Sequence, residues 1–350
     1  MSLVHHLSDH SPLTTWITTR CAVDTAVASA LADLQRQRLQ PRRPRPGLPL
    51  EHHAAVGAIV GQRLADAIEP APPYPALLGG VRCQAWSLAD AGRLAAGYPT
   101  HRAERGAPEA AAIWRRPTPT GWWQPLPTPA EQPVEPERGL VDVLARHRRA
   151  VAGLRRARLA ARDTERDLLD PLRALQLLEG IYRGGTDLVE LQRIATTGRV
   201  RLAADLVDDV LAVLGGQEPA LRQARALAGG GPHFGYAAPL LVPGWAEGDV
   251  LVGPHPADGC FTLLDVKTVG HLDEVRLRSW LVQTLAYALL DFADRWRIRR
   301  VGIWLARHAH IVGWPLDQLI PGDLTAARTE FAAAVTPLAA ADGADPRHVA

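Results

Sequence analysis

The chain has 350 residues, of which 47% are hydrophobic and 22% are charged. Such a composition is typical of a globular protein with two or three domains, or with one large domain. The net charge of +2 is too small to indicate nucleic-acid binding by itself, and the three scattered cysteines indicate neither a disulfide framework nor a cysteine metal site.

Neither a signal peptide nor a membrane span is predicted. Residues 1–6 have no basic segment and no apolar segment of the kind that directs secretion. No apolar run in the sequence approaches the roughly 20 residues that cross a bilayer. We therefore expect a cytoplasmic protein with no membrane partner, and the sequence leaves its oligomeric state open.

Residues 1–115 are predicted to form an N-terminal helical region. Its first helix covers residues 11 to about 40, with Ser11 as the N-cap and Pro12 as the first helical residue. A basic run broken by prolines follows at 36–46. This run is either an arm that contacts phosphates or a solvated loop.

A second helix is predicted over 51–69. Its glycines Gly57 and Gly61 lie four residues apart, so one face of this helix is flat. We expect another element to approach that face closely.

Residues 116–137 are rich in proline and are predicted to be a linker or a loop on the surface. Trp122 and Trp123 lie in this segment. They could stack on nucleic-acid bases, or they could anchor the loop to the body of the protein.

Residues 138–232 form the second predicted helical region, which is basic over its first half. Arginines spaced one to four residues apart would make a basic stripe, the strongest candidate for contact with a nucleic-acid backbone. The alternative is a solvated face whose charge is balanced by Asp163, Glu165 and Asp167. The predicted nucleic-acid-binding residues are Arg148, Arg149, Arg155 and Arg156.

The last region, residues 233–340, alternates between strands and helices before a tail at 341–350. We therefore predict an α/β fold with a small mixed central sheet flanked by helices and a large helical N-terminal region. Strands are predicted near 237–242, 249–252, 261–269, 300–306 and 308–314, and helices over about 273–296 and 324–340.

The predicted strand at 261–269 contains the only lysine of the chain, Lys267, against 38 arginines. Lysine is a compact charge whose pKa responds to its surroundings, whereas arginine stays protonated and presents a wide planar fork. Asp265 lies two residues earlier, so both side chains project from one face of the strand, and Val266 points the opposite way into a core. The pair is either a site that needs a small cation beside a carboxylate or an ion pair on a solvent face.

Two neighbouring segments add polar residues in a fixed order. Asp249 stands at the start of the preceding predicted strand. Gln283 and Tyr287 lie four residues apart in the following predicted helix, so they share one helix face. The chain thus carries an acidic strand start, an Asp-x-Lys strand and a helix with Gln-x-x-x-Tyr.

This ordered set resembles the PD-(D/E)xK nuclease superfamily, and within it the RecB-like branch that carries Gln-x-x-x-Tyr. The resemblance covers roughly residues 233–320 and implies a restriction-endonuclease-like core. RecB-like nucleases also carry a helix with Gly-x-x-x-His. The helix at 51–69 has Gly57 but Gly61 in the histidine position, so the family's histidine ligand has no counterpart there.

The resemblance implies a deoxyribonuclease that depends on Mg²⁺ or Mn²⁺ and hydrolyses phosphodiester bonds of single- or double-stranded DNA, as an endo- or exonuclease. Such hard cations prefer oxygen ligands. The implied metal ligands are Asp249, Asp265 and the carbonyl of Val266. The implied catalytic residues are Asp249, Asp265, Lys267, Gln283 and Tyr287.

Lys267 would orient the attacking water and stabilise the charged transition state, and Gln283 and Tyr287 would position it or a phosphate from behind. Glu247 is an alternative metal ligand. One alternative function is a catalytically inactive nuclease fold that binds nucleic acid or a protein partner. Another is a structural protein, which would leave the lone lysine unexplained. DNA repair and antiphage defence are both open as pathways.

Overall fold

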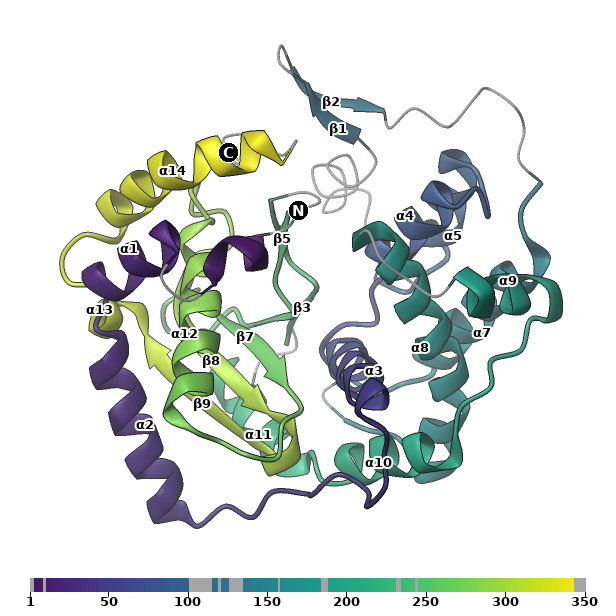
Figure 1. The fold of residues 1–350 in the computed structure, drawn as a ribbon, viewed down its shortest axis with the longest axis horizontal. Helices are drawn as coiled ribbons and strands as arrows, with labels where there is room; N and C mark the ends of the chain where they lie inside the picture. The colour runs from purple at the N-terminus through teal and green to yellow at the C-terminus, as the bar shows by residue number, and fades with distance from the viewer. Residues whose placement is uncertain are drawn as a thin grey trace. The chain divides into compact units, whose positions relative to one another are not determined.

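The computed structural model of the protein describes residues 3–8, 11–100, 115–118, 121–125, 135–156, 158–183, 188–230, 234–242 and 245–342. The chain divides into two compact units, which are described separately (Figure 1). Unit 1 comprises Met1–Pro44 and Gly216–Ala350, and unit 2 comprises Arg45–Gly215. The predicted N-terminal region, 1–115, is divided between the two units, and the first predicted helix belongs to the unit that contains the sheet.

Unit 1 is built around a mixed sheet whose described strands have the order β3-β6-β7-β8-β9. β7 and β8 are parallel, and the other neighbouring strands pair antiparallel. β4 and β5 form a separate two-stranded sheet. The strands are β3 (Gly235–Ala237), β4 (Leu240–Val242), β5 (Ala246–Glu247), β6 (Val250–Val252), β7 (Phe261–Lys267), β8 (Ile298–Leu305) and β9 (His310–Pro315). The predicted α/β class with a small mixed sheet flanked by helices is confirmed.

α12 (Glu274–Leu289) is the crossover that two parallel strands require, and it joins β7 to β8. It begins at Asp273, whose side chain accepts a hydrogen bond of 2.8 Å from the backbone N–H of Arg276. It ends at Leu289, earlier than predicted, and the positive φ of 54° at Asp294 shows that the chain beyond it is no longer helical.

Other helices pack on the two sides of this core. On the side of α12, the helices in contact with it are α1 (Pro12–Arg20), α2 (Val23–Gln37) and α14 (Leu324–Ala341). On the other side, α11 (Glu218–Leu227) packs against β9 and β6. The short elements of unit 1 are η1 (Leu3–Leu7), η2 (Ala306–His308) and α13 (Leu316–Leu319).

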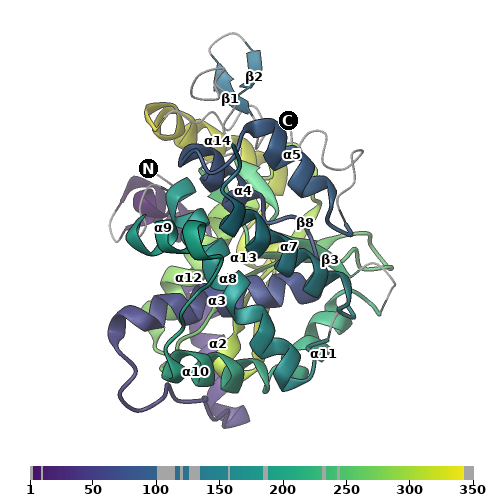
Figure 2. The ribbon, with the colours of Figure 1, turned by 90° about the vertical axis from the view of Figure 1, so that its right-hand side faces the viewer.

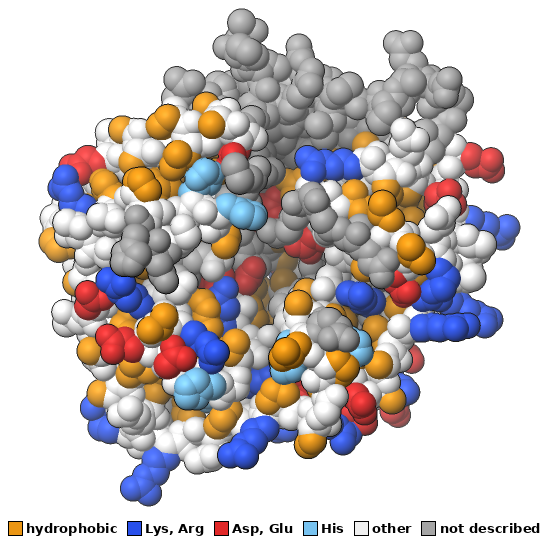
Figure 3. Space-filling model, viewed as in Figure 1, with side chains coloured by type: hydrophobic (Ala, Val, Ile, Leu, Met, Phe, Trp, Pro, Cys, Tyr) orange, Lys and Arg blue, Asp and Glu red, His pale blue; other side chains and the backbone are white. Residues whose placement is uncertain are grey.

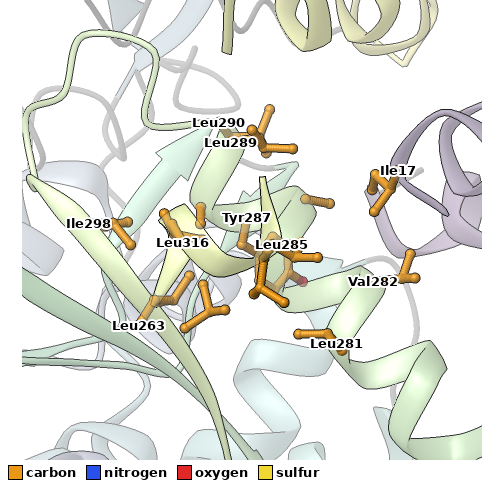
Figure 4. Packing of buried hydrophobic residues seen from close by; sticks show 14 of the residues in the cluster. Ile17, Leu263, Leu281, Val282, Leu285, Tyr287, Leu289, Leu290, Ile298 and Leu316 are labelled. Atoms are coloured by element: carbon orange, nitrogen blue, oxygen red, sulfur yellow. The ribbon is translucent and has the colours of Figure 1, made fainter. Parts of the chain in front are cut away.

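The first predicted helix is two helices, α1 and α2, that separate at Cys21 and Ala22. Its predicted start is confirmed, because the Ser11 hydroxyl accepts a hydrogen bond of 3.1 Å from the backbone N–H of Thr14. A single buried cluster joins α1, α12 and the sheet, as Figure 4 shows for Ile17, Leu263 and Leu285. This cluster holds β7 and α12 together, and these are the two elements that carry most of the predicted site.

Unit 2 is helical, and its longest described helix, α8 (Arg162–Arg183), lies among α3, α4 and α7 (Figures 1 and 2). The other helices are α3 (Leu50–Ile68), α4 (Tyr74–Arg82), α5 (Leu88–Ala96), α7 (Arg138–Ala152), α9 (Leu188–Thr197) and α10 (Ala204–Leu214). In the proline-rich segment, β1 (Arg115–Thr118) and β2 (Gly121–Pro125) pair as a hairpin. The side chains of Trp122 and Trp123, to which roles were assigned, lie outside what the structure describes.

The close helix contact in unit 2 is not where the sequence predicted it. A Cβ atom built on Gly61 would meet nothing within 4 Å. A Cβ atom built on Gly79 of α4 would lie 1.7 Å from the carbonyl oxygen of Leu178 in α8. The helices α4 and α8 therefore need a glycine at their contact, and so do α7 and α9, where a Cβ atom on Gly139 would lie 2.2 Å from the Ala195 carbonyl oxygen; the prediction for Gly61 was wrong.

Candidate active site

β7 places its acidic and basic residues on the face that α12 covers. Asp265 and Lys267 share this face, and Val266 between them points to the opposite one, as predicted. The Lys267 Nζ atom lies 2.8 Å from the Asp265 Oδ2 atom. Asp265 is only 3% exposed, so the pair is not an ion pair on a solvent face.

Asp249 reaches the same place from the neighbouring strand. It immediately precedes β6, and the antiparallel register that pairs Val250 with Leu264 brings Asp249 to the level of Asp265. Its Oδ2 atom accepts a hydrogen bond of 2.7 Å from the backbone N–H of Val266. The two carboxylates and the Val266 peptide group thus lie together at one end of β7.

The helix residues lie behind the lysine in a connected row. Lys267 Nζ donates to Gln283 Oε1 at 3.2 Å, and Gln283 Nε2 donates to the Tyr287 hydroxyl at 3.3 Å. Tyr287 is 6% exposed and lies among the buried hydrophobic residues of α12 (Figure 4). The predicted spacing of four residues on one helix face therefore produces a side-chain relay that holds the lysine amine in place.

The electrostatics of the site are dominated by burial and by the excess of carboxylates. Burial raises the pKa of Asp265 to about 6; the Lys267 ammonium opposes this shift and the nearby Asp249 adds to it. Burial alone would lower the pKa of Lys267, but the carboxylates of Asp265 and Asp249 outweigh it and raise that pKa above its ordinary value. Lys267 is therefore an ammonium at neutral pH, and a second cation would relieve the repulsion between the two carboxylates.

The residues fit a hard divalent cation on one further observation. The buried Asp265 Oδ2 atom has the Lys267 ammonium 2.8 Å away, and the Asp249 carboxylate also acts on that ammonium, so one ammonium faces two carboxylates. An excess of buried negative charge is costly unless a second cation offsets it. A cation with oxygen ligands would do so.

The donor set is small. Within the described ranges, no group of three or more His, Cys, Asp or Glu residues lies close enough together to hold a metal ion. Glu247, the alternative ligand, lies in β5 and therefore does not complete a cluster with the two aspartates. A cation here would have two carboxylates, the Val266 carbonyl and water as ligands, which suits Mg²⁺ because this ion keeps several waters.

Sequence reasoning missed one residue beside the site. Arg307 is 2% exposed, and its Nε atom donates to the carbonyl of Thr268, next to Lys267, at 2.8 Å. Its own carbonyl accepts a hydrogen bond of 2.8 Å from the backbone N–H of Arg42. Arg307 thus fixes the end of β7, but as one of 38 arginines it has no distinguishing signal in the sequence.

The predicted basic stripe of unit 2 is interrupted. Arg148 and Arg149 lie in α7, whereas Arg155 and Arg156 lie in the loop that follows its end at Ala152. Arg149, Arg155 and Arg156 are exposed, but Arg148 is half-buried. A Cβ atom built on Gly97 would meet its Nη1 at 2.2 Å, so the Arg148 guanidinium packs on that glycine.

The acidic residues that could balance the charge of these arginines do not all do so. Glu165 is 3% exposed and accepts two hydrogen bonds of 2.7 Å from Arg63, so it neutralises a buried arginine instead of the exposed ones.

On the face of unit 1 seen in Figure 3, basic and acidic side chains are interspersed, and no single sign of charge dominates. The exposed arginines of the α7–α8 loop therefore remain candidates for contact with phosphates.

Comparison of the chain with protein-family models, with curated proteins and with solved structures finds no match in any of the three. Among the helices that the structure describes, none is both long enough and apolar enough to cross a membrane. What the protein does must therefore be inferred from its own residues.

Proposed function

We propose that this protein is a deoxyribonuclease that depends on Mg²⁺ or Mn²⁺ and belongs to the RecB-like branch of the PD-(D/E)xK superfamily. The observation that carries the proposal is the meeting of Asp249, Asp265 and Lys267 at one end of β7, where two carboxylates face a single ammonium. A structural ion pair would not need a second carboxylate facing the same lysine.

The topology of unit 1 supports the same proposal. Antiparallel β3, β6 and β7, followed by the crossover α12 and the parallel strand β8, are the order of elements expected of a restriction-endonuclease-like core. Asp265 and Lys267 lie on β7, and Asp249 immediately precedes β6 beside them. Fold alone does not define an activity, so the site residues carry the proposal and the topology supports it.

The residues divide the work of hydrolysis between them. Asp249, Asp265 and the Val266 carbonyl would hold the cation, which supplies a more acidic bound water and neutralises charge on the phosphate. Lys267, held as an ammonium, donates to the attacking water or to the phosphate oxygens, where negative charge grows in the transition state.

The remaining contacts keep these groups in position. The Val266 N–H fixes the Asp249 carboxylate at 2.7 Å, and Gln283 fixes the Lys267 amine at 3.2 Å. Because Tyr287 in turn holds the Gln283 amide, the lysine cannot rotate freely toward solvent. Pre-set donors of this kind reduce the reorganisation that the reaction requires.

DNA in the cytoplasm is the proposed substrate, with repair and antiphage defence as the two pathways in which such an enzyme could act. The competing function is a nuclease fold that binds DNA or a protein without cutting. The small donor set and the glycine at position 61 favour that alternative. The intact row from Asp265 to Tyr287 favours catalysis.

The test is incubation of the purified full chain with linear duplex, circular duplex and single-stranded DNA, in Mn²⁺ and in EDTA. We expect cleavage in Mn²⁺ alone, and cleavage restricted to DNA with free ends would define an exonuclease. A matched control is Arg20→Gln, which changes an exposed arginine of α1 and should cut as the parent does. If no DNA is cut but DNA is bound in Ca²⁺, the inactive alternative holds and the proposed activity is wrong.

A further inference from the structure

Unit 1 contains a cavity of about 460 Å³ on the sheet face opposite to Asp265 and Lys267. It lies between α11 and the edge strand β9, and its lining includes Gln223, Leu227, Thr262, Arg300, Ile311 and Pro315. Small-molecule sites are concave, mostly apolar and of this size, with a few convergent polar groups. The proposed nuclease chemistry uses none of these residues.

The cavity exists because β9 has a glycine where the sheet would otherwise present a side chain. Gly313 pairs with Gly302 of β8, and its neighbours on the same face are Ile311 and Pro315. A Cβ atom built on Gly313 would meet only the Val301 carbonyl oxygen, at an ordinary 3.5 Å. The space above Gly313 is therefore open, and a larger side chain could enter it.

Two polar groups at this cavity have no partner in the part of the chain that the structure describes. Thr262 is 1% exposed, and its hydroxyl makes no hydrogen bond. The Arg300 Nη1 atom is also buried without a partner, while Nη2 of the same guanidinium donates to Asp258. Thr262 and Arg300 are register partners on β7 and β8, so they offer adjacent donors.

Gln223, the third polar side chain of the cavity, already has partners for both the oxygen and the nitrogen of its amide. Its Oε1 accepts from the backbone N–H of Ile311 at 2.8 Å, and its Nε2 lies 3.0 Å from His310 Nδ1. The groups left over are a hydroxyl and a cationic N–H, both of which can donate. Buried donors of this kind are costly unless an acceptor meets them.

We propose that this cavity binds a small organic anion whose apolar body lies against Ile311 and Pro315. Its acidic oxygens accept hydrogen bonds from Arg300 Nη1 and the Thr262 hydroxyl. A planar or branched hydrocarbon body suits the apolar lining, and a carboxylate or sulfonate matches a charge-assisted donor beside a hydroxyl. The site is separate from the nuclease site, since Thr262 and Asp265 project from opposite faces of β7.

The test is a fluorescence titration of the full chain with 1-anilinonaphthalene-8-sulfonate, and with N-phenyl-1-naphthylamine as its neutral counterpart. We expect saturable binding of the sulfonate at one site. Arg300→Gln should weaken the sulfonate at least about tenfold, because it removes a hydrogen bond from a charged donor, while the neutral probe changes less than about twofold. Gly313→Val should weaken both probes, because its branched side chain enters the space that their apolar bodies would occupy.

Arg20→Gln serves as the control for the loss of a positive charge, and it should leave both affinities unchanged. If Gly313→Val does not fold, Ala226→Phe narrows the cavity from α11, where Ala226 is exposed and tolerates a larger side chain. Absence of saturable sulfonate binding overturns the proposal. Undiminished affinity for the probes in both Gly313→Val and Ala226→Phe also overturns it, and so does a loss of affinity in Arg300→Gln that is equal for the two probes.

Discussion

Replacing Lys267 with arginine separates a positive charge from a positioned amine. The amine lies 2.8 Å from Asp265 Oδ2 and 3.2 Å from Gln283 Oε1, in a setting where the lysine side chain is 21% exposed. A guanidinium is wider, spreads its donors over a plane and cannot lose its proton. It cannot keep both contacts and also present a donor where the amine points now.

The expected loss follows from the contacts that disappear. One hydrogen bond from a charged donor is worth about 1.5–3 kcal/mol. Since 1.36 kcal/mol changes a rate tenfold, the loss of one such contact in the transition state is about 10- to 150-fold. We predict that Lys267→Arg lowers the single-turnover cleavage rate about a hundredfold, with DNA affinity in Ca²⁺ and the melting temperature little changed.

Lys267→Met is the matched variant, because it removes the charge but keeps an unbranched chain. The amine-positioning role predicts that the Arg and Met variants are both severely impaired. If Lys267→Arg cuts at a rate close to that of the parent while Lys267→Met is inactive, Lys267 is a simple cation. The mechanism given for this residue is then wrong.

Four further outcomes are expected. Asp249→Asn keeps an acceptor for the Val266 N–H but loses the charge. Loss of a residue that only supports a metal ligand costs roughly 10- to 100-fold, so loss of the ligand Asp249 should lower the cleavage rate by more than that. A cleavage rate close to that of the parent across a Mg²⁺ titration would remove Asp249 from the proposed ligands. Gln283→Met frees the lysine amine and should lower the rate about tenfold without raising the apparent KM for DNA, and a change in KM alone would indicate a role in binding. In EDTA, the free energy of unfolding should fall as pH rises from about 4 to about 6. Burial raises the pKa of Asp265 from 3.8 to about 6, so over this range the folded protein binds more protons than the unfolded one. Urea unfolding of Asp265→Asn should lack this fall, and parallel pH profiles of the parent and the variant would contradict the prediction. Replacing Arg149, Arg155 and Arg156 with glutamine should reduce the salt slope of duplex binding by up to about 2.7, at 0.9 per phosphate contact, and an unchanged slope would place the DNA elsewhere.

Sequence periodicity predicted the elements that carry the site. The two-residue alternation of β7 and the four-residue spacing in α12 each brought together the residues that they were expected to bring together, because both depend only on local geometry. The meeting of Asp249 with Asp265 depends instead on strand register. No feature of either strand alone defines that register, and only the paired sheet provides it.

Long-range packing could not be predicted in the same way. Gly79 and Gly139 permit close helix contacts and Gly61 does not, because the outcome depends on which helices become neighbours. The positions of Glu165 beside Arg63 and of Arg307 beside Thr268 likewise depend on tertiary structure. The cavity above Gly313 arises from a glycine in an edge strand, whose effect appears only when α11 and the sheet are assembled.

The most direct test of a metal-dependent nuclease site is the cleavage rate of the parent and of Asp265→Asn, measured side by side across a Mg²⁺ titration. The substitution keeps the shape of the buried side chain and removes the charge that a cation requires. We predict Mg²⁺-dependent hydrolysis by the parent, and a loss of at least about a hundredfold in the variant, which should still unfold cooperatively. Equal rates in the two proteins, or hydrolysis by neither at any Mg²⁺ concentration, would contradict the proposed activity.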